Sequence, residues 1–193
     1  MMRCAWKYLP PKGKSDTAWI VVLNPDETCD HTPAWATKIV GDGAALLMAP
    51  RGTGPLKWED KPPFYIQRSL ALLGRTVDSG RVTDVASLAE YTHHVASSLN
   101  WKITGRGQAG IIAAYAAILA PEHCISEAVV VDPPVSHRDG PIFLNVLRVL
   151  DIPDALGMFA PRPLTIHSDK PDSFVRTVQL YKATEGVLQV RKK

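Results

Sequence analysis

The chain has 193 residues, 46% of them hydrophobic and 21% charged, which is typical of a folded protein that buries a sizeable core, so we expect residues 1–193 to form one domain. The formal net charge of +3 is small and the basic residues are dispersed, apart from the last three, which argues against nucleic-acid binding. The apolar runs are too short to span a membrane, and the first eleven residues lack the unbroken apolar core of a signal peptide.

Short apolar runs alternate with helical patterns along the chain. In the first half of the chain the patterns predict strands at 4–9, 18–23 and 44–48, then a helix at 65–73 and a longer helix with an apolar stripe from Val85 to Leu99. In the second half they predict a strand at 101–104, a helix at 108–119, a strand at 128–131, a helix at 141–150 and a strand at 164–167. The last two elements are a helix whose buried face holds Phe174, Val178 and Tyr181, and a strand at 187–191. Strands that are apolar throughout are typical of parallel sheets covered on both faces. The sequence therefore predicts an α/β fold, a doubly wound and mainly parallel sheet flanked by helices, which binds ligands at the carboxyl ends of its strands.

The most informative segment is the glycine-rich turn between the strand at 101–104 and the helix that follows it. In one interpretation it is a nucleophile elbow, with Gly105, Gly107 and Ala109 in the positions of a G-x-S-x-G motif. Gly107 then stands where the attacking serine is expected, and the backbone N–H of Gln108 is left as part of an oxyanion hole. This interpretation predicts the shape of a hydrolase site without its nucleophile.

Two other interpretations of the same turn stay open. Gly105, Gly107 and Gly110 also fit G-x-G-x-x-G, and Asp132 ends the next strand, where dinucleotide-binding folds place a ribose-binding acid. This alternative predicts an NAD(P)-binding oxidoreductase, although the motif lies past the middle of the chain. In the third interpretation the glycines have only a structural role, because they allow a tight turn and close helix packing.

Three further segments carry a family resemblance when they are taken with the turn. They are 6–13 with the strand after it, the loop at 49–54 (APRGTG) and the stretch at 160–169 (APRPLTIHSD). Together these segments resemble the α/β-hydrolase superfamily, in particular bacterial esterases of the acetyl-xylan-esterase and dienelactone-hydrolase type. The resemblance implies a minimal hydrolase-like fold without a large cap domain, with the nucleophile position at Gly107 and the acid at Asp169. The base falls on no residue, because only two lysines follow the last strand.

The segment after the strand at 128–131 holds the other candidate side chains. Ser136 is a candidate displaced nucleophile with His137 as its base, whereas the alternative is that both residues only cap a loop. A divalent cation could be bound by side chains that follow neighbouring strands, namely His137, Asp139, His167, Asp169 and Asp172. The chain has no HxH or HExxH spacing to support such a site, so we expect no metal and no other cofactor.

These observations predict a relative of carboxylic-ester or lactone hydrolases without a standard Ser-His-Asp triad. It would be a weak, atypical esterase or lactonase with a small ester or lactone as its ligand, or a noncatalytic relative. A scaffold for ligand binding or interaction is a further alternative, favoured if an exposed apolar patch pairs protomers in a homo-oligomer. Cys4, Cys29 and Cys124 have no CxxC spacing, so we expect reduced thiols and a cytoplasmic location.

Overall fold

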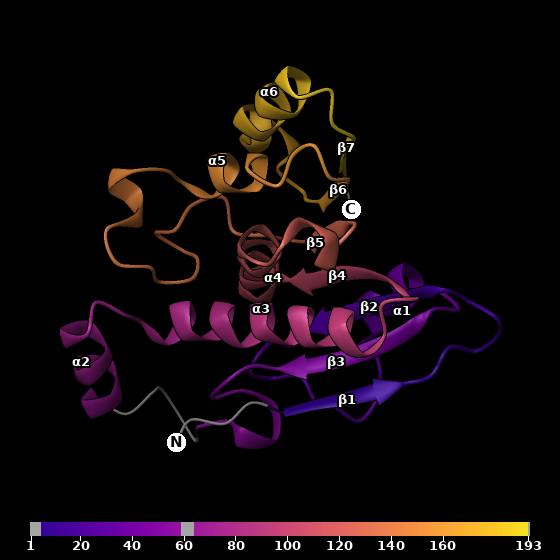
Figure 1. Ribbon diagram of the computed structural model, residues 1–193. Helices are drawn as coiled ribbons and strands as arrows, with labels where there is room; N and C mark the ends of the chain where they lie inside the picture. Colours follow the sequence, from indigo (N-terminus) through magenta and orange to yellow (C-terminus); the bar gives the residue numbers. More distant parts are fainter. Residues whose placement is uncertain (1–4, 59–63, 193) are drawn as a thin grey trace.

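The computed structural model describes residues 5–58 and 64–192, in which seven strands form one sheet (Figure 1). The strands are β1 (Ala5–Leu9), β2 (Thr17–Val22), β3 (Ala44–Ala49), β4 (Asn100–Arg106), β5 (Ala128–Val131), β6 (Leu164–His167) and β7 (Leu188–Arg191). Their order in the sheet is β1-β3-β2-β4-β5-β6-β7, and all neighbours are parallel except β1 and β3. The predicted fold class, a compact α/β fold with a mainly parallel sheet, is confirmed. Residue 4, and with it Cys4, lies outside the described residues.

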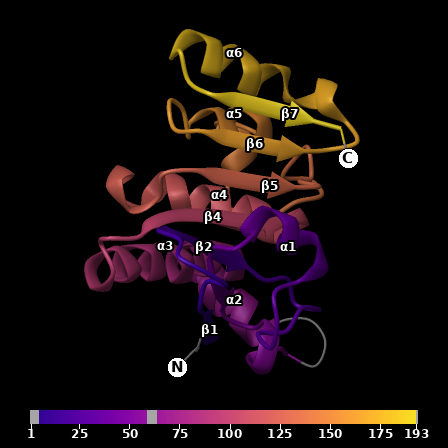
Figure 2. The same ribbon diagram turned by 90° about the vertical axis from the view of Figure 1, so that its right-hand side faces the viewer.

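Helices cover the sheet on two sides. They are α1 (Ala34–Val40), α2 (Phe64–Leu72), α3 (Val77–Val95), α4 (Gly107–Leu119), α5 (Ile152–Gly157) and α6 (Val175–Ala183). Figures 1 and 2 show α3 and α4 together on one side of the sheet and α1 on the other. The larger core cluster contains side chains of α3, α4, α5 and α6, and the smaller one contains those of α1. In the described part of the chain, no helix has both the length and the apolar character needed to cross a membrane.

The two faces of the sheet differ at its β6–β7 end. In the central strands β2 and β3 nearly every side chain is buried, because helices pack on both sides. In β6, Leu164 and Ile166 are buried on the side of the larger core, whereas Thr165 and His167 face the other side and are half-buried. The smaller core reaches only as far as β5, so the apolar stretch predicted at 164–167 is covered by helices on one face alone.

The prediction of a helix at 141–150 is wrong. Only Val146–Arg148 form one short 3₁₀ turn, and Asn145 adopts a left-handed backbone with φ +61°, which an α-helix cannot contain. The backbone N–H of Ile142 donates to the carboxylate of Asp78 (2.8 Å) instead of to a helical carbonyl. The segment also exposes Ile142 and Val149 to solvent, so its apolar residues do not form one buried helix face.

The direction in which the chain adds strands to the sheet reverses between β2 and β4. The chain leaves β2 toward β3 on one side, and later returns to β4 on the other side of β2. The loops that follow these two adjacent parallel strands therefore run to opposite sides, which opens a crevice at the carboxyl edge of the sheet. The glycine-rich turn follows β4 and lies at this point.

Candidate functional site

The glycine-rich turn has the geometry of a sharp strand-to-helix corner. Strand β4 ends at Arg106 and helix α4 starts at Gly107, whose backbone is left-handed with φ +59°. A Cβ atom on Gly105 would lie 2.6 Å from the carbonyl oxygen of Ala109, and one on Gly110 would lie 2.7 Å from the carbonyl oxygen of Gly105. These two glycines therefore allow strand and helix to pack at backbone contact. A Cβ on Gly107 would meet no atom within 4 Å, so the space in front of the corner is open.

Asn24, in the loop after β2, holds the corner from the neighbouring strand. Its side-chain amide donates to the carbonyl oxygen of Arg106 (3.0 Å), and its side-chain oxygen accepts from the backbone N–H of Ala109 (3.4 Å). The second contact satisfies one of the N–H groups that the start of a helix leaves without an intrahelical partner. Asn24 thus joins the loop after β2 to the first turn of α4.

The carboxylate of Glu27 accepts hydrogen bonds from several donors around this loop. One of its carboxylate oxygens accepts from the Trp35 indole N–H (2.6 Å) and from the Arg106 guanidinium (3.1 Å). The other accepts from the backbone N–H of Asn24 (2.8 Å). The Glu27 side chain is only 9% exposed, so its charge is balanced mainly by these contacts. No local motif marks Asn24 or Glu27, because both meet the corner across about eighty residues, so neither was predicted from the sequence.

His137 is held by hydrogen bonds on both ring nitrogens. Its Nδ1 lies 2.9 Å from the carbonyl oxygen of Pro141, which can only accept, so Nδ1 carries the proton. Its Nε2 forms a hydrogen bond with the hydroxyl of Tyr115 on α4 (2.8 Å). Burial and the charge of Asp151 raise the pKa of Tyr115 to about 12, so this phenol keeps its proton at neutral pH. Tyr115 was not predicted from the sequence.

Ser136 is bound to the loop around it. Its Oγ accepts from the backbone N–H of Arg138 (3.2 Å), and its side chain forms a hydrogen bond with Asp151 that lowers the pKa of the Asp151 carboxyl. Burial acts to raise the pKa of the Asp151 carboxyl, but hydrogen bonds from His137 and Ser136 lower it overall. The polar groups of this loop therefore form hydrogen bonds with one another and with the start of α5, which Asp151 caps.

The other predicted site residues lie apart from one another. Asp169 is exposed after β6, and the exposed Gln108 reaches the backbone oxygen of Asp139 at 3.5 Å. None of the hydrogen bonds or ion pairs between described residues joins His137, Asp169 and the corner at Gly107. Over residues 5–58 and 64–192 no three His, Cys, Asp or Glu side chains are grouped so that they could hold a metal ion. The roles assigned to Ser136, His137 and Asp169 stay predictions.

Asp132 and His167 lie at the ends of two paired strands, β5 and β6. Asp132 has a left-handed backbone (φ +47°), and its N–H donates to the carbonyl oxygen of His167 (2.8 Å). The pKa of His167 lies below its ordinary value because burial and the charge of Arg191 outweigh the opposite effect of Asp132. Asp132 is also the acid of the dinucleotide alternative, which stays a prediction.

The lowered pKa of His167 predicts that acid destabilises the protein in a defined window. As the pH falls through about 6.5, the histidine of the unfolded chain takes up a proton before that of the folded chain. The free energy of unfolding should therefore fall as the pH is lowered from about 7.5 through 6.5 toward the lower pKa of the folded chain. We expect His167→Gln to make this fall shallower in urea titrations at several pH values, whereas the exposed His31→Gln should not. An unchanged pH dependence in His167→Gln would contradict this prediction.

A cavity of about 440 Å³ lies beside the loop that holds the corner. Its walls include Pro25, which follows Asn24, together with the side chains of Trp58, Ile142 and Leu144. The cavity is thus mainly apolar and lies near the open crevice between β2 and β4.

Comparisons with known proteins agree with this geometry at the level of the fold. No family model and no curated protein matches the sequence. Est1E from Butyrivibrio proteoclasticus, solved with ferulic acid bound, aligns over 100% of this chain and 86% of its own, with a TM-score of 0.66 and 14% identity. An alpha-beta serine hydrolase homologue from Coxiella burnetii aligns over 100% and 82%, with a TM-score of 0.63 and 15% identity. Acetyl xylan esterase 1 from Thermoanaerobacterium sp. aligns over 97% and 71%, with a TM-score of 0.58 and 13% identity.

The fold and the geometry of the corner together define the structural class of this chain. The chain has a compact α/β-hydrolase-like fold, the architecture of these serine hydrolases and esterases. At 13–15% identity the similarity concerns the fold and leaves the activity of this chain to be argued from its own residues.

Proposed function

We propose that this protein is a hydrolase-fold relative that binds a small ester, lactone or similar molecule at the carboxyl edge of its sheet without Ser-His-Asp hydrolysis. The observation that carries the proposal is Gly107, which occupies the central, left-handed position of the corner and has open space in front of it. A serine hydrolase needs its nucleophilic oxygen at that position, within hydrogen-bond reach of a base. Gly107 has no side chain to supply this oxygen.

The surroundings of His137 support the same proposal. Both of its ring nitrogens are already engaged, one by Tyr115 and one by the Pro141 carbonyl, so the imidazole would have to leave these contacts to act as a base. Asn24 and the first turn of α4 keep the corner in shape, and the neighbouring apolar cavity offers room for a ligand. We therefore propose that the site retains the shape of a hydrolase site and has lost its covalent chemistry.

A direct test measures covalent labelling and turnover. The wild-type protein should not react with a fluorophosphonate probe for serine hydrolases, and should hydrolyse a short p-nitrophenyl ester no faster than Gly107→Ala does. Labelling of Ser136 with accompanying turnover, sensitive to His137→Ala or Asp169→Ala, would overturn the proposal and identify a displaced nucleophile.

The matched variant is Gly107→Ser, which restores the hydroxyl. A Cβ fits at this position, so we expect the variant to fold with only the modest cost of a left-handed non-glycine residue. Turnover that appears in Gly107→Ser alone would support the assignment of Gly107 to the nucleophile position. Turnover that is equal and above background in the wild type, Gly107→Ala and Gly107→Ser would contradict it.

A further inference from the structure

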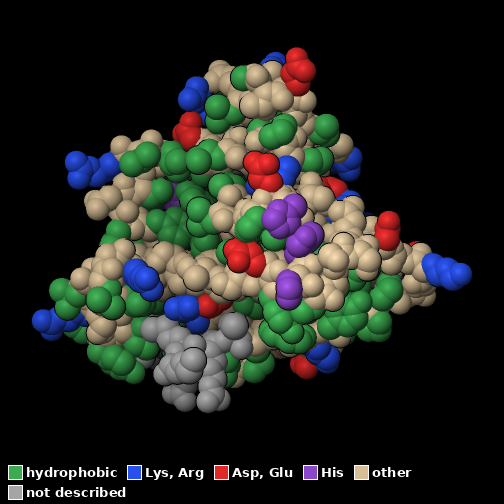
Figure 3. All heavy atoms as spheres, viewed as in Figure 1, with side chains coloured by type: hydrophobic (Ala, Val, Ile, Leu, Met, Phe, Trp, Pro, Cys, Tyr) green, Lys and Arg blue, Asp and Glu red, His purple; other side chains and the backbone are tan. Residues whose placement is uncertain are grey.

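A second pocket lies on the helical face of the molecule, away from the corner. It has a volume of about 410 Å³ and is bounded by the end of α2, the first half of α3, the second half of α4 and the segment around Phe143. Figure 3 shows a hollow on this face, above α3, in which hydrophobic side chains gather. Its lining residues include neither Gly107 nor Asn24 nor Glu27. It shares Arg75 and Thr76 with the cavity of about 440 Å³ near the corner, whereas Leu119 and Phe143 line this pocket and not that cavity.

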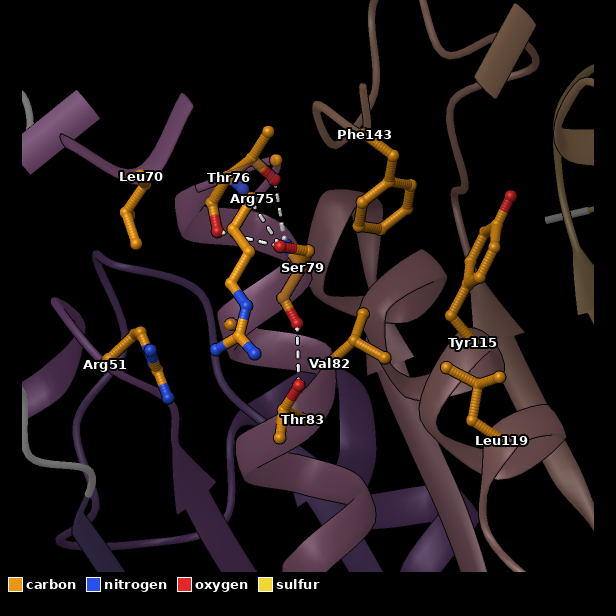
Figure 4. A pocket seen from close by; sticks show the side chains of 12 residues that line it. Arg51, Leu70, Arg75, Thr76, Ser79, Val82, Thr83, Tyr115, Leu119 and Phe143 are labelled. Atoms are coloured by element: carbon orange, nitrogen blue, oxygen red, sulfur yellow. Dashed lines mark hydrogen bonds between the residues drawn. The ribbon is translucent and has the colours of Figure 1, made fainter. Parts of the chain in front are cut away.

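One side of the pocket is apolar. Val82, Leu119, Phe143 and the ring of Tyr115 line it, and Figure 4 shows them side by side. The hydroxyl of Tyr115 is bound to His137, so this residue presents its ring to the pocket. Leu119 is 68% exposed although it is an aliphatic residue, which leaves it available for contact with a ligand. This side suits a hydrocarbon chain or an aromatic ring.

The opposite side carries positive charge. Arg51 and Arg75 line it, and in Figure 4 the guanidinium of Arg75 extends down into the space between Arg51 and Ser79. Asp84 neutralises Arg51 through two close contacts (2.8 and 2.5 Å). No carboxylate among residues 5–58 and 64–192 forms an ion pair with Arg75. The pocket thus contains one cation whose charge has no partner in the described part of the chain.

The hydroxyl groups in the pocket are already used as donors. Thr76 donates to the carbonyl oxygen of Ile142 (2.5 Å), Ser79 to that of Thr76 (2.9 Å) and Thr83 to that of Ser79 (3.1 Å). They can accept hydrogen bonds from a ligand but have no proton left to offer an anion. Recognition of an anion in this pocket therefore falls to the guanidinium of Arg75.

We propose that this pocket binds a monocarboxylic acid with an apolar body, an aliphatic or aryl acid whose carboxylate meets Arg75 and whose hydrocarbon part lies against Leu119 and Phe143. A guanidinium matches a carboxylate with two parallel N–H donors, and a single negative charge matches a single cation that has no carboxylate partner among the described residues. The apolar side then removes the rest of the ligand from water, which a small inorganic anion would not exploit.

The test uses octanoate and its uncharged counterpart 1-octanol in NMR titrations of the folded protein. Octanoate should bind saturably in the millimolar range or tighter, with shifts centred on the amide signals of Arg75, Leu119 and Phe143. Arg75→Gln should weaken octanoate binding by about tenfold or more and leave octanol binding unchanged. Leu119→Ser should weaken the binding of both compounds, because it removes apolar contact without changing charge.

Arg68→Gln is the matched control, since Arg68 is an exposed arginine of α2 outside the pocket and its replacement should change neither affinity. All three variants alter exposed side chains, so their folding can be checked by the unchanged remainder of the spectrum. Three results would each overturn the proposal: no saturable octanoate binding, equal weakening by Arg68→Gln and Arg75→Gln, or octanol binding as tightly as octanoate.

Discussion

Replacing Glu27 with alanine is expected to lower the free energy of unfolding by about 3 kcal/mol, one of the two largest effects that the structure predicts. The carboxylate is largely buried and accepts hydrogen bonds from the Trp35 indole, the Arg106 guanidinium and the backbone N–H of Asn24. Its removal leaves these donors without their acceptor, and it leaves the charge of Arg106 without its partner. Urea denaturation followed by tryptophan fluorescence measures the loss.

Two variants separate this effect from a general loss of negative charge. Asp26 is an exposed neighbour of Glu27, so Asp26→Ala should change the free energy of unfolding by no more than about 0.5 kcal/mol. Glu27→Gln keeps an acceptor oxygen in the same place and should cost less than Glu27→Ala. A Glu27→Ala variant as stable as Asp26→Ala would show that the loop after β2 does not depend on these contacts.

The second large effect concerns Gly105, where alanine should cost about 2 to 3 kcal/mol. The added methyl group would lie 2.6 Å from the carbonyl oxygen of Ala109, and a backbone atom at the start of a buried helix cannot move aside cheaply. Strand β4 and helix α4 would have to separate, which disturbs the packing of the central strand. Urea denaturation gives the loss in the free energy of unfolding.

Alanine at Gly107 provides the comparison within the same turn. Here the methyl group meets no atom within 4 Å, so the cost is only that of a left-handed backbone, about 1 kcal/mol. Gly13→Ala, in a loop with open space and no left-handed backbone, should be neutral within about 0.5 kcal/mol. If Gly107→Ala proved more costly than Gly105→Ala, the close packing seen at the corner would not limit stability.

The sequence predicted the strands well because apolar runs are a local signal. The runs at 128–131 and 164–167 coincide with β5 and β6, and the run at 44–48 forms all but the last residue of β3. Helix α4 was predicted for a similar reason, since its apolar stretch stops at Pro121. The short helices α1 and α5 were missed, because six or seven residues carry too little periodicity to stand out.

The predicted helix at 141–150 failed for a different physical reason. Its apolar residues satisfy a helical pattern, but the pattern does not contain the bond from Ile142 to Asp78 or the left-handed backbone of Asn145. A contact across sixty-four residues decides the path of this segment and outweighs its local preference. Phe143 is placed in the wall of the second pocket as a result.

By itself the sequence determined the positions of the strands along the chain and the sharp glycine corner, because backbone preference and apolar periodicity act between near neighbours. Only the tertiary structure decided which polar groups surround that corner and what they bind. It placed Asn24 and Glu27 against the corner, and it engaged His137 with Tyr115. Such pairings join residues far apart in the chain, and they depend on how the sheet brings its loops together, which no local pattern records.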